Sequence, residues 1–375
     1  MMVTAPGKLM LSGEWSVLEV GFPCIVMAIN QRVGVEIKKS KSIIIHAPDL
    51  GITDISADFS GGKLHWKNTL DEKKQGKLLI AKNAIELSLA YLQSKNHHES
   101  ELFEIKTFSS DTTAKPPNGT IAKVGFGSSA AVCVAIVGAI LKLNGYDLLK
   151  KETKDLVFKI ACTAHYLAQG KVGSSFDIAA STYGGALVYT RFDPDWLTKE
   201  MGSGKSVAQL LDSDWPAFTA ENMKLPERFE LLVGFVGYSA STKELILRMN
   251  SFKETQKEHY WQIIDSIKTI TMSLIDAIKQ NNEELIIELI KQNRKQLLDL
   301  SNASQCNLET KEHTILAEIA EKYGCAGKFS GAGGGDCGIA ISFDKEKSKK
   351  IKNAWKRNGI TPLRVKIDFK GVSCL

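Results

Sequence analysis

The segment G-F-G-S-S-A-A, residues 125–131, leads into the longest apolar stretch of the chain, A-A-V-C-V-A-I-V-G-A-I-L at residues 130–141. We interpret it as a glycine-rich loop that opens a long buried helix, with Gly145 as its natural end. A helix N-terminus carries unpaired N–H groups and a partial positive charge, so it binds phosphate readily. The alternative is a plain serine N-cap on a core helix, and this loop alone leaves both interpretations open.

The segment matches neither of two familiar phosphate-binding patterns. It lacks the lysine of GxxxxGK[ST] and the third glycine of GxGxxG, so it is not a Walker loop or a dinucleotide-binding turn. Ser128 and Ser129 could cap the helix, donate to a phosphate, or place a hydroxyl on Mg²⁺.

Length and composition limit the kinds of protein that this chain can be. A chain of 375 residues predicts two domains, and 43% hydrophobic with 24% charged residues is typical of a soluble globular protein. The net charge of +6 suits a protein that handles anions but is too small to predict nucleic-acid binding. The stretch 130–141 is too short to span a bilayer. Residues 1–15 have no basic region ahead of an apolar stretch, so we expect no signal peptide. Seven scattered cysteines without a CxxC pair predict a reduced, cytoplasmic chain with no zinc site.

The order of the predicted elements favours an α+β fold over a doubly wound sheet, because helices and strands do not alternate strictly. The segment 193–228, rich in Asp, Trp, Pro and Gly, is interpreted as a connector between domains. Strands are expected at residues 3–10 (broken at Pro6 and Gly7), 24–29, 33–39, 185–192, 229–237, 326–330, 337–343 and 362–369. Helices are expected at residues 77–93, 153–170, 243–300 with one break, 309–323 and 344–358.

A second loop, G-K-V-G-S-S-F-D at residues 170–177, places an acid beside hydroxyls and a lysine. Lys171, Ser174, Ser175 and Asp177 suit an anionic substrate and proton transfer. The commoner fate of such residues is to cap the next helix, and that alternative is favoured by the loop alone.

A third loop, S-G-A-G-G-G-D-C-G at residues 330–338, sets three successive glycines between two predicted strands. We favour a nest of backbone N–H groups that binds an anion, because a two-residue hairpin would not need so many glycines. Cys337 is interpreted as a buried thiol without chemistry, since no base lies beside it in sequence.

Weaker candidates lie elsewhere in the chain. Lys8 in A-P-G-K could reach a phosphate, and Ser241 and Thr242 precede a predicted helix. The seven histidines show no metal-binding spacing and are interpreted as structural or exposed. The lysine-rich run 344–357 is interpreted as a solvated helix face.

The order of these motifs, A-P-G-K at 5–8, G-F-G-S-S-A-A at 125–131 and G-A-G-G-G at 331–335, resembles the GHMP kinase superfamily of small-molecule kinases. The resemblance covers residues 5 to about 341 and is least in the connector. It implies a ribosomal-protein-S5-like N-terminal domain and a ferredoxin-like C-terminal domain. We place their bounds at 1–195 and 229–375, with 196–228 between them.

Within the superfamily, A-H-Y-L-A-Q-G-K-V-G-S-S-F-D-I-A-A-S-T-Y-G-G at 164–185 is similar to a signature of the phosphomevalonate kinases, as is D-C-G after the last glycines. The opening A-P-G-K fits the mevalonate diphosphate decarboxylases poorly. The resemblance implies ATP and Mg²⁺ as cofactors, mevalonate 5-phosphate as substrate, and no nucleic-acid or membrane partner. A monomer or a homodimer is expected.

The resemblance also implies roles for individual residues. Lys8 and Asp177 would be catalytic, with Asp177 orienting Lys8 and the acceptor, and Ser129 would bind Mg²⁺. ATP would bind at Gly125, Phe126, Gly127, Ser128, Ser129 and Ala130. Substrate would bind at Lys8, Glu14, Lys171, Ser174, Ser175, Asp177, Ser241, Thr242, Gly333 and Asp336.

The sequence differs from the mevalonate kinases at the expected metal site. Mevalonate kinases place a carboxylate in the helix before the catalytic aspartate, but residues 160–171 contain no acid. The ion would then be held by Ser129, nucleotide oxygens and water. The alternatives are a mevalonate kinase or another GHMP kinase acting on a hydroxyl, and a non-catalytic ligand sensor that kept the fold.

Overall fold

The first half of the chain forms a large sheet around the long strand β2 (Pro23–Lys39). The structure is a computed structural model that describes residues 1–95, 101–109, 113–114, 122–170, 173–238 and 242–375. The sheet runs β10-β9-β2-β6-β3-β4-β5, and β1 pairs with both β2 and β15. All pairings are antiparallel except β3 with β6. The other strands are β1 (Met2–Ser12), β3 (Ile43–Ala47), β4 (Ile52–Ser60), β5 (Lys63–Trp66), β6 (Phe103–Ser109), β9 (Ala186–Thr190), β10 (Thr219–Met223) and β15 (Ser373–Cys374). Short elements are β7 (Thr113–Ala114), β8 (Ala122–Lys123) and 3₁₀ turns at Ser16–Leu18 and Pro48–Leu50.

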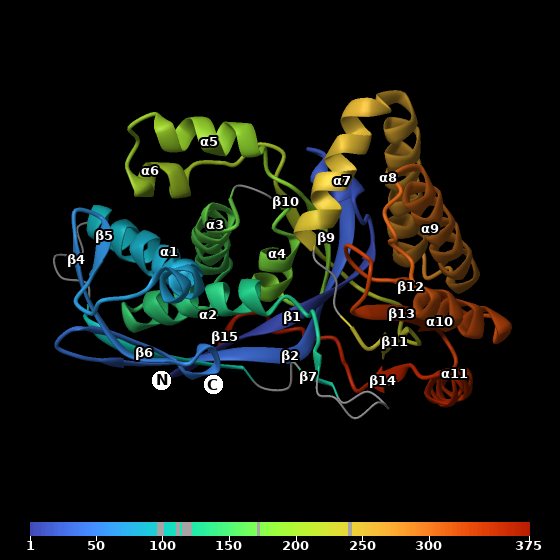
Figure 1. Ribbon diagram of the computed structural model, residues 1–375, viewed down its shortest axis with the longest axis horizontal. Coiled ribbons are helices and arrows are strands. Elements are labelled where there is room, and N and C mark those ends of the chain that lie inside the picture. Colours follow the sequence, from blue (N-terminus) through green and yellow to red (C-terminus); the bar gives the residue numbers. More distant parts are fainter. Residues whose placement is uncertain (96–100, 110–112, 115–121, 171–172, 239–241) are drawn as a thin grey trace.

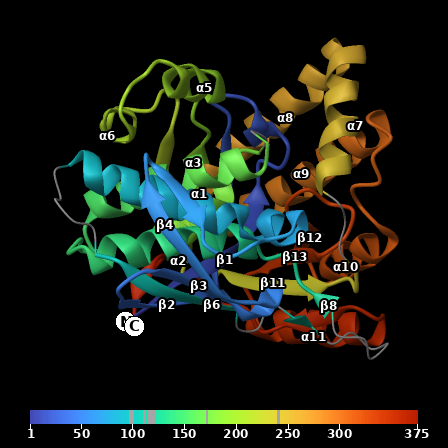
Figure 2. The ribbon, with the colours of Figure 1, turned by 60° about the vertical axis from the view of Figure 1, so that its left-hand side comes forward.

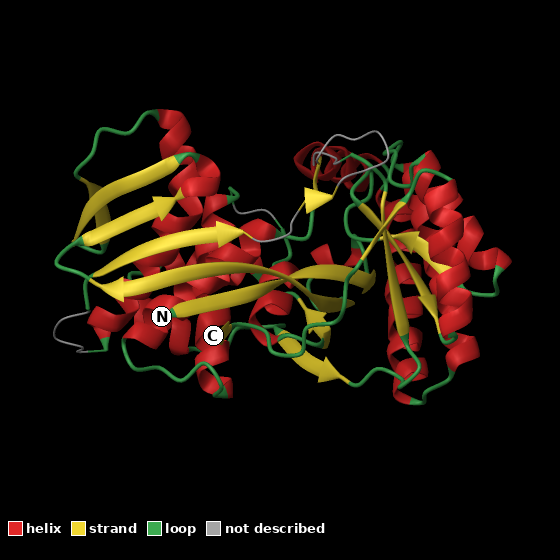
Figure 3. Ribbon diagram, turned by 90° about the horizontal axis from the view of Figure 1, so that it is seen from below, coloured by secondary structure: helices red, strands yellow, loops and turns green. Residues whose placement is uncertain are grey.

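Four helices cover one face of this sheet, which Figure 3 shows with the strands in front and the helices behind. They are α1 (Glu72–Ser94), α2 (Ser128–Leu143), α3 (Lys151–Ala168) and α4 (Phe176–Tyr183). The helix α2 lies at the centre and packs against β1, β2, α1, α3 and α4. Because it is enclosed on all sides, its sequence is apolar all round, as expected for a fully buried helix.

The second sheet is ferredoxin-like. Its strands β11 (Glu230–Phe235), β12 (Ala326–Phe329), β13 (Cys337–Ser342) and β14 (Thr361–Leu363) run antiparallel in the order β12-β13-β11-β14. Its helices are α7 (Thr242–Thr255), α8 (Lys257–Lys279), α9 (Glu283–Ala303), α10 (Lys311–Lys322) and α11 (Lys345–Arg357). Alternate residues of β11 face opposite sides: Leu232 packs with α10 and α11, while Val233 packs with α8, α9 and the first sheet.

The segment between the two sheets is folded onto the first one. It forms α5 (Pro194–Gly202), α6 (Val207–Asp212) and β10, and Leu197, Leu211 and Trp215 join the core of the first sheet. Figure 1 shows α5 and α6 on the same side of the sheet as α1 and α3. The domain bounds stay a prediction, and the segment called a connector contributes a strand to the first sheet.

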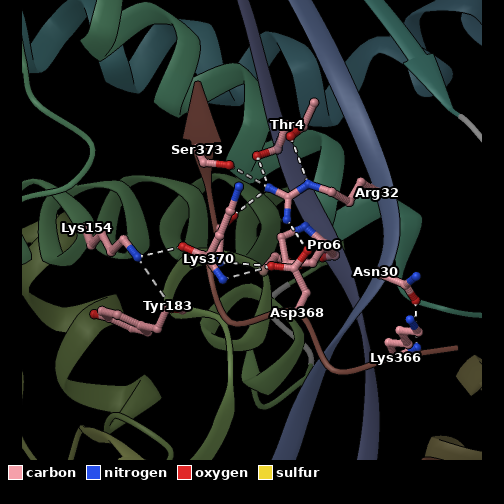
Figure 4. Close-up of polar contacts among 12 residues, drawn as sticks. Thr4, Pro6, Asn30, Arg32, Lys154, Tyr183, Lys366, Asp368, Lys370 and Ser373 are labelled. Carbon is pink, nitrogen blue, oxygen red and sulfur yellow. Dashed lines mark hydrogen bonds and ion pairs between the residues drawn. The ribbon is translucent and has the colours of Figure 1, made fainter. Parts of the chain in front are cut away.

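The last residues, 364–375, form a C-terminal strap that returns from the second sheet to the first. Val3 pairs with Cys374, so the two ends of the chain lie side by side, as Figures 1 and 2 show. Arg32 fastens the strap: its guanidinium pairs with Asp368 and donates to the Gly371 carbonyl at 2.6 Å and to Ser373 Oγ at 2.9 Å (Figure 4). One planar group therefore satisfies several partners of the strap at once.

The α+β class is confirmed, and several predicted elements need correction. The expected strands 24–29 and 33–39 are one strand, β2, because the polar residues between them serve the strap: Asn30 bonds Lys366 and Arg32 bonds Asp368. The break predicted at Pro6 and Gly7 is a register shift inside a continuous β1, where a proline is tolerated.

Further corrections concern the second domain. The helical region 243–300 has two breaks rather than one, since α7, α8 and α9 are separate helices. The expected last strand at 362–369 is the short β14, and the chain beyond it leaves the second sheet for the strap. None of the helices in the described residues is long and apolar enough to cross a bilayer.

Candidate active site

A cleft of about 430 Å³ brings the three glycine loops together. It lies between the N-terminus of α2, the start of α4 and the turn between β12 and β13. Eleven predicted site residues line it: Lys8, Glu14, Gly125, Gly127, Ser128, Ser129, Ser174, Ser175, Asp177, Gly333 and Asp336. Segments far apart in sequence therefore meet at one place, as their order along the chain had suggested.

The start of α2 is open towards the cleft. Gly127 is the N-cap in a left-handed conformation with φ of 78°, and no side chain among the described residues caps the helix. The serine N-cap interpretation is therefore wrong, and the first N–H groups of α2 are left for another acceptor. Gly127 also has little room, because a Cβ there would lie 3.3 Å from Cε of Lys8 and 3.7 Å from Cβ of Asp177.

Lys8 lies beside this helix start. Its backbone N–H donates to the Phe126 carbonyl at 2.9 Å, and its Nζ donates to the Gly125 carbonyl at 3.3 Å. The ammonium also lies over the Phe176 ring, 5.9 Å from the ring centre. The cation and the positive end of α2 thus act on the same part of the cleft.

The second loop supplies Asp177 in the first turn of α4. Its carboxylate accepts the N–H of Ile178 at 3.0 Å, and in the described residues it makes no ion pair with Lys8. Ser175 is the N-cap with φ of 61°, yet its hydroxyl makes no capping bond, so the favoured capping alternative is wrong for this serine. Ser174 is 4% exposed and its carbonyl accepts the Tyr189 hydroxyl at 2.6 Å.

The third loop closes against the first. The N–H of Gly125 donates to Oδ1 of Asp336 at 3.1 Å. Gly333 has φ of 81° and a Cβ there would lie 2.5 Å from the Leu308 carbonyl, so glycine is required. Ser330 exchanges hydrogen bonds with the backbone of Met10 at 2.8 and 2.9 Å, which joins this loop to β1.

These loops match those of a known family over both domains. The family model described as GHMP kinases N terminal domain matches residues 82–185, and the one described as GHMP kinases C terminal matches residues 274–361. The chain belongs to the GHMP kinases. The predicted superfamily and its two-domain fold are confirmed.

This GHMP kinase resembles relatives of two activities to a similar degree. It is 28% identical to the phosphomevalonate kinase of Streptomyces sp. (strain CL190), over 98% of this chain and 97% of that one. It is 29% identical to the mevalonate kinase of Pyrococcus furiosus, over 98% and 96%. The family is a kinase family, and identity alone does not separate the two substrates.

Solved structures resemble it along the whole chain. The Lin0012 protein from Listeria innocua is 31% identical with a TM-score of 0.85, covering 98% of each chain. The phosphomevalonate kinase of Streptococcus pneumoniae, solved with phosphomevalonate and AMPPNP, is 26% identical with a TM-score of 0.79, covering 98% of this chain and 99% of that one.

Other predicted residues of the GHMP kinase lie away from the cleft or outside the described residues. Phe126 and Ala130 are buried in the core, so only their backbone could contact a nucleotide. Lys171 and Ser241 fall outside the described residues, and Thr242 begins α7 without a described side chain. Burial raises the pKa of the Cys337 thiol above its ordinary value, and Asp336 adds to this, which fits an unreactive cysteine.

Sequence reasoning missed a buried ion pair behind the cleft. Lys328 on β12 binds Oε1 of Glu14, and both side chains are fully buried. Burial lowers the pKa of Lys328 and the Glu14 carboxylate opposes that shift. Oε2 of Glu14 has no hydrogen-bond partner in the described part of the chain. The substrate role predicted for Glu14 therefore stays a prediction beside its structural role.

Sequence reasoning also dismissed His165, which lines the cleft and contacts Ser129 at 3.2 Å. Among the described residues no three His, Cys, Asp or Glu side chains gather into a metal site. Ser129 and Asp177 line the cleft and offer oxygen atoms of the kind that Mg²⁺ prefers as ligands. A separate hollow of about 600 Å³ lies between β10 and the α8–α9 turn, and none of the described residues of the glycine loops lines it.

Proposed function

We propose that this GHMP kinase transfers the terminal phosphoryl group of ATP to mevalonate 5-phosphate, giving mevalonate 5-diphosphate and ADP. The supporting observation is the convergence of Lys8, the open N-terminus of α2 and the third glycine loop on one cleft. Further support comes from the similarity to phosphomevalonate kinases of known structure and sequence. The proposal places the enzyme in the mevalonate pathway of isoprenoid biosynthesis.

The electrostatics explain why these groups are needed. Both reactants are anions, and two unit charges 4 Å apart repel by about 4 kcal/mol at an effective dielectric of ~20. Lys8 and the helix N-terminus lie together and offset this repulsion without moving during the reaction. Phosphoryl transfer depends mostly on such positioning and charge neutralisation.

The acceptor needs no strong base. A phosphate ester has a second pKa near ~6, so the acceptor oxygen is already mostly ionised at neutral pH. Asp177 and Lys8 both lie close to Gly127, so Asp177 would orient the ammonium and the acceptor, and remove a proton only secondarily. Ser174, Ser175, Gly333 and Asp336 line the same cleft and are proposed to contact the substrate, with Lys171, Ser241 and Thr242 as further predicted contacts.

The nucleotide would bind at the first loop. Gly125, Gly127 and Ser128 would hold its phosphates through the open end of α2, with backbone contacts from Phe126 and Ala130. When bound, Mg²⁺ supplies charge neutralisation at the phosphate oxygens, and Ser129 would be its ligand from the protein. The free thiols of all seven cysteines accord with the predicted cytoplasmic location, and a monomer or homodimer remains the expected state.

A second candidate is a kinase that phosphorylates a hydroxyl, such as a mevalonate kinase, which the 29% identity to the Pyrococcus furiosus enzyme supports. An ADP-release screen over mevalonate 5-phosphate, mevalonate, homoserine and galactose decides between them, with Lys8→Met as the control for contaminating kinases. We expect kcat/KM for the 5-phosphate to exceed that for mevalonate by about 10⁴, because the site would leave polar groups unpaired without it. Faster turnover of mevalonate would overturn the substrate, and no turnover of any acceptor would indicate a sensor.

A further inference from the structure

A buried histidine contacts the serine at the start of α2. His165 lies on α3 with 3% of its surface exposed, and it lines the cleft. Its Nε2 is 3.2 Å from Oγ of Ser129 and 3.2 Å from the side-chain Nε2 of Gln169. Gln169 follows the end of α3 four residues after His165, so its side chain lies back over the same helix face.

With the Gln169 amide oriented as it is in the structure, these contacts assign the hydrogens to particular atoms. An amide nitrogen can only donate, so Nε2 of His165 accepts from Gln169 and carries no hydrogen of its own. In the contact with Ser129 the hydroxyl is then the donor, and it shares the single lone pair of this nitrogen with Gln169. Both lone pairs of the Ser129 oxygen remain for an acceptor role, which is what a divalent cation requires of a serine ligand.

We propose that His165 is a positioning residue that holds the Ser129 hydroxyl as an acceptor for the cation of a bound metal–nucleotide. The proposal rests on the nucleotide site of the proposed function but not on the identity of the phosphoryl acceptor. It assigns a role to a histidine in a stretch of sequence, 160–171, that contains no carboxylate.

The first test reads the tautomer of His165 directly. Protein labelled with ¹⁵N-histidine is examined by long-range proton–nitrogen NMR at mildly alkaline pH, with His165→Gln used to assign the ring. We expect the hydrogen on Nδ1 and none on Nε2. A hydrogen on Nε2 overturns the proposal, because Ser129 could not then donate to that nitrogen.

The second test separates positioning from general structure. Binding of AMPPNP is measured by calorimetry with and without Mg²⁺ in the wild type, His165→Phe and His165→Gln. We expect Mg²⁺ to raise the AMPPNP affinity of His165→Phe about 10-fold less than it raises the affinity of the wild type. A loss of this size is usual when a group that orients a metal ligand is removed. Affinity without metal should stay unchanged, and His165→Gln, which retains an acceptor oxygen, should recover most of the loss.

A double variant tests whether His165 and Ser129 act through the same contact. In a Ser129→Ala background, His165→Phe should have no further effect on the Mg²⁺-dependent affinity, since both act through one hydroxyl. Equal loss with and without metal in His165→Phe, or additive losses in the double variant, overturns the proposal. These binding and NMR experiments contain no phosphoryl acceptor, so they do not depend on the substrate assignment. An error in the substrate would appear only in the ADP-release screen, and an error in the role of His165 would appear only in the NMR and calorimetry.

Discussion

The backbone N–H of Gly125 donates to Oδ1 of Asp336 at 3.1 Å, which joins the first and last glycine loops across 211 residues of sequence. A Cβ at position 125 would lie 2.4 Å from Oδ2 of the same carboxylate. Gly125→Ala must therefore displace Asp336 and open the contact between the two domains at the cleft.

We expect Gly125→Ala to lower kcat/KM by about 10²-fold, since displacements near 1 Å at a reacting site have costs of this size. Steady-state kinetics measures the loss, and Gly76→Ala serves as the control because nothing lies within 4 Å of its added Cβ. In an Asp336→Ser background the effect of Gly125→Ala should shrink. An undiminished effect there would show that the clash is not with the carboxylate.

Lys8 should matter more for the chemical step than Asp177. Removing the ammonium from the start of α2 in Lys8→Met leaves the repulsion between the anions uncompensated, and we expect kcat to fall by about 10³-fold or more. Asp177→Asn keeps the shape of the side chain, and a phosphate acceptor needs no strong base. We therefore expect kcat to fall only about 10-fold in this variant. Single-turnover rates give both values. Equal losses of many decades would instead indicate base-driven transfer to a hydroxyl.

The buried pair of Glu14 and Lys328 should carry a large stability cost when only one partner is removed. Lys328→Met leaves a carboxylate buried without its cation, which we expect to cost about 3–5 kcal/mol of unfolding free energy. The urea midpoint measures this loss. The double variant Glu14→Gln, Lys328→Met should regain most of it, because no charge is then left unpaired. A double variant no more stable than the single one would contradict this account.

Stability should fall in mildly acidic solution because of His313. Its ring is fully buried, and burial lowers its pKa from 6.5 to about 4, which Glu309 and Glu312 partly oppose. The pKa is lower in the folded chain, so this stability is present above pH 6.5 and is lost as the pH falls from 6.5 to about 4. The loss amounts to about 3 kcal/mol at 1.36 kcal/mol per pKa unit.

Urea midpoints between pH 7 and pH 4.5 test this prediction with His313→Gln. Glutamine can keep the capping box that His313 forms with Thr310, but it does not titrate. We expect a flatter pH dependence in the variant than in the wild type. Identical slopes would assign the acid sensitivity to other groups.

Local pattern was sufficient to predict the three loops. Ser129 and Asp177 each sit in a short motif whose conformation is set by its own glycines and by the following helix, whereas Lys8 lies in β1, and all three line one cleft. The apolar periods of α1, α3 and α10 likewise predicted those helices to within a few residues. The strands β3, β4 and β5 escaped prediction. β3 and β5 have only five and four residues, and the alternation of the nine-residue β4 is interrupted at Asp54, which has a positive φ of 58°.

The contacts that assemble the site could not be read from local pattern. Glu14 meets Lys328, and Arg32 meets Asp368, over separations of more than 300 residues that only the tertiary fold brings together. His165 was set aside among the histidines because its partner, Ser129, lies on a different helix. Its spacing of four residues from Gln169 was the one local signal for its role.

The most direct test of the proposed reaction is the ³¹P NMR spectrum of the product made from ATP and mevalonate 5-phosphate, recorded after separation from nucleotides. The proposed reaction forms a P–O–P bond, so the isolated product should show two phosphorus signals coupled to each other. Two uncoupled phosphate-ester signals would show that the enzyme phosphorylates a hydroxyl of its substrate, and would contradict the assignment of a phosphate as acceptor.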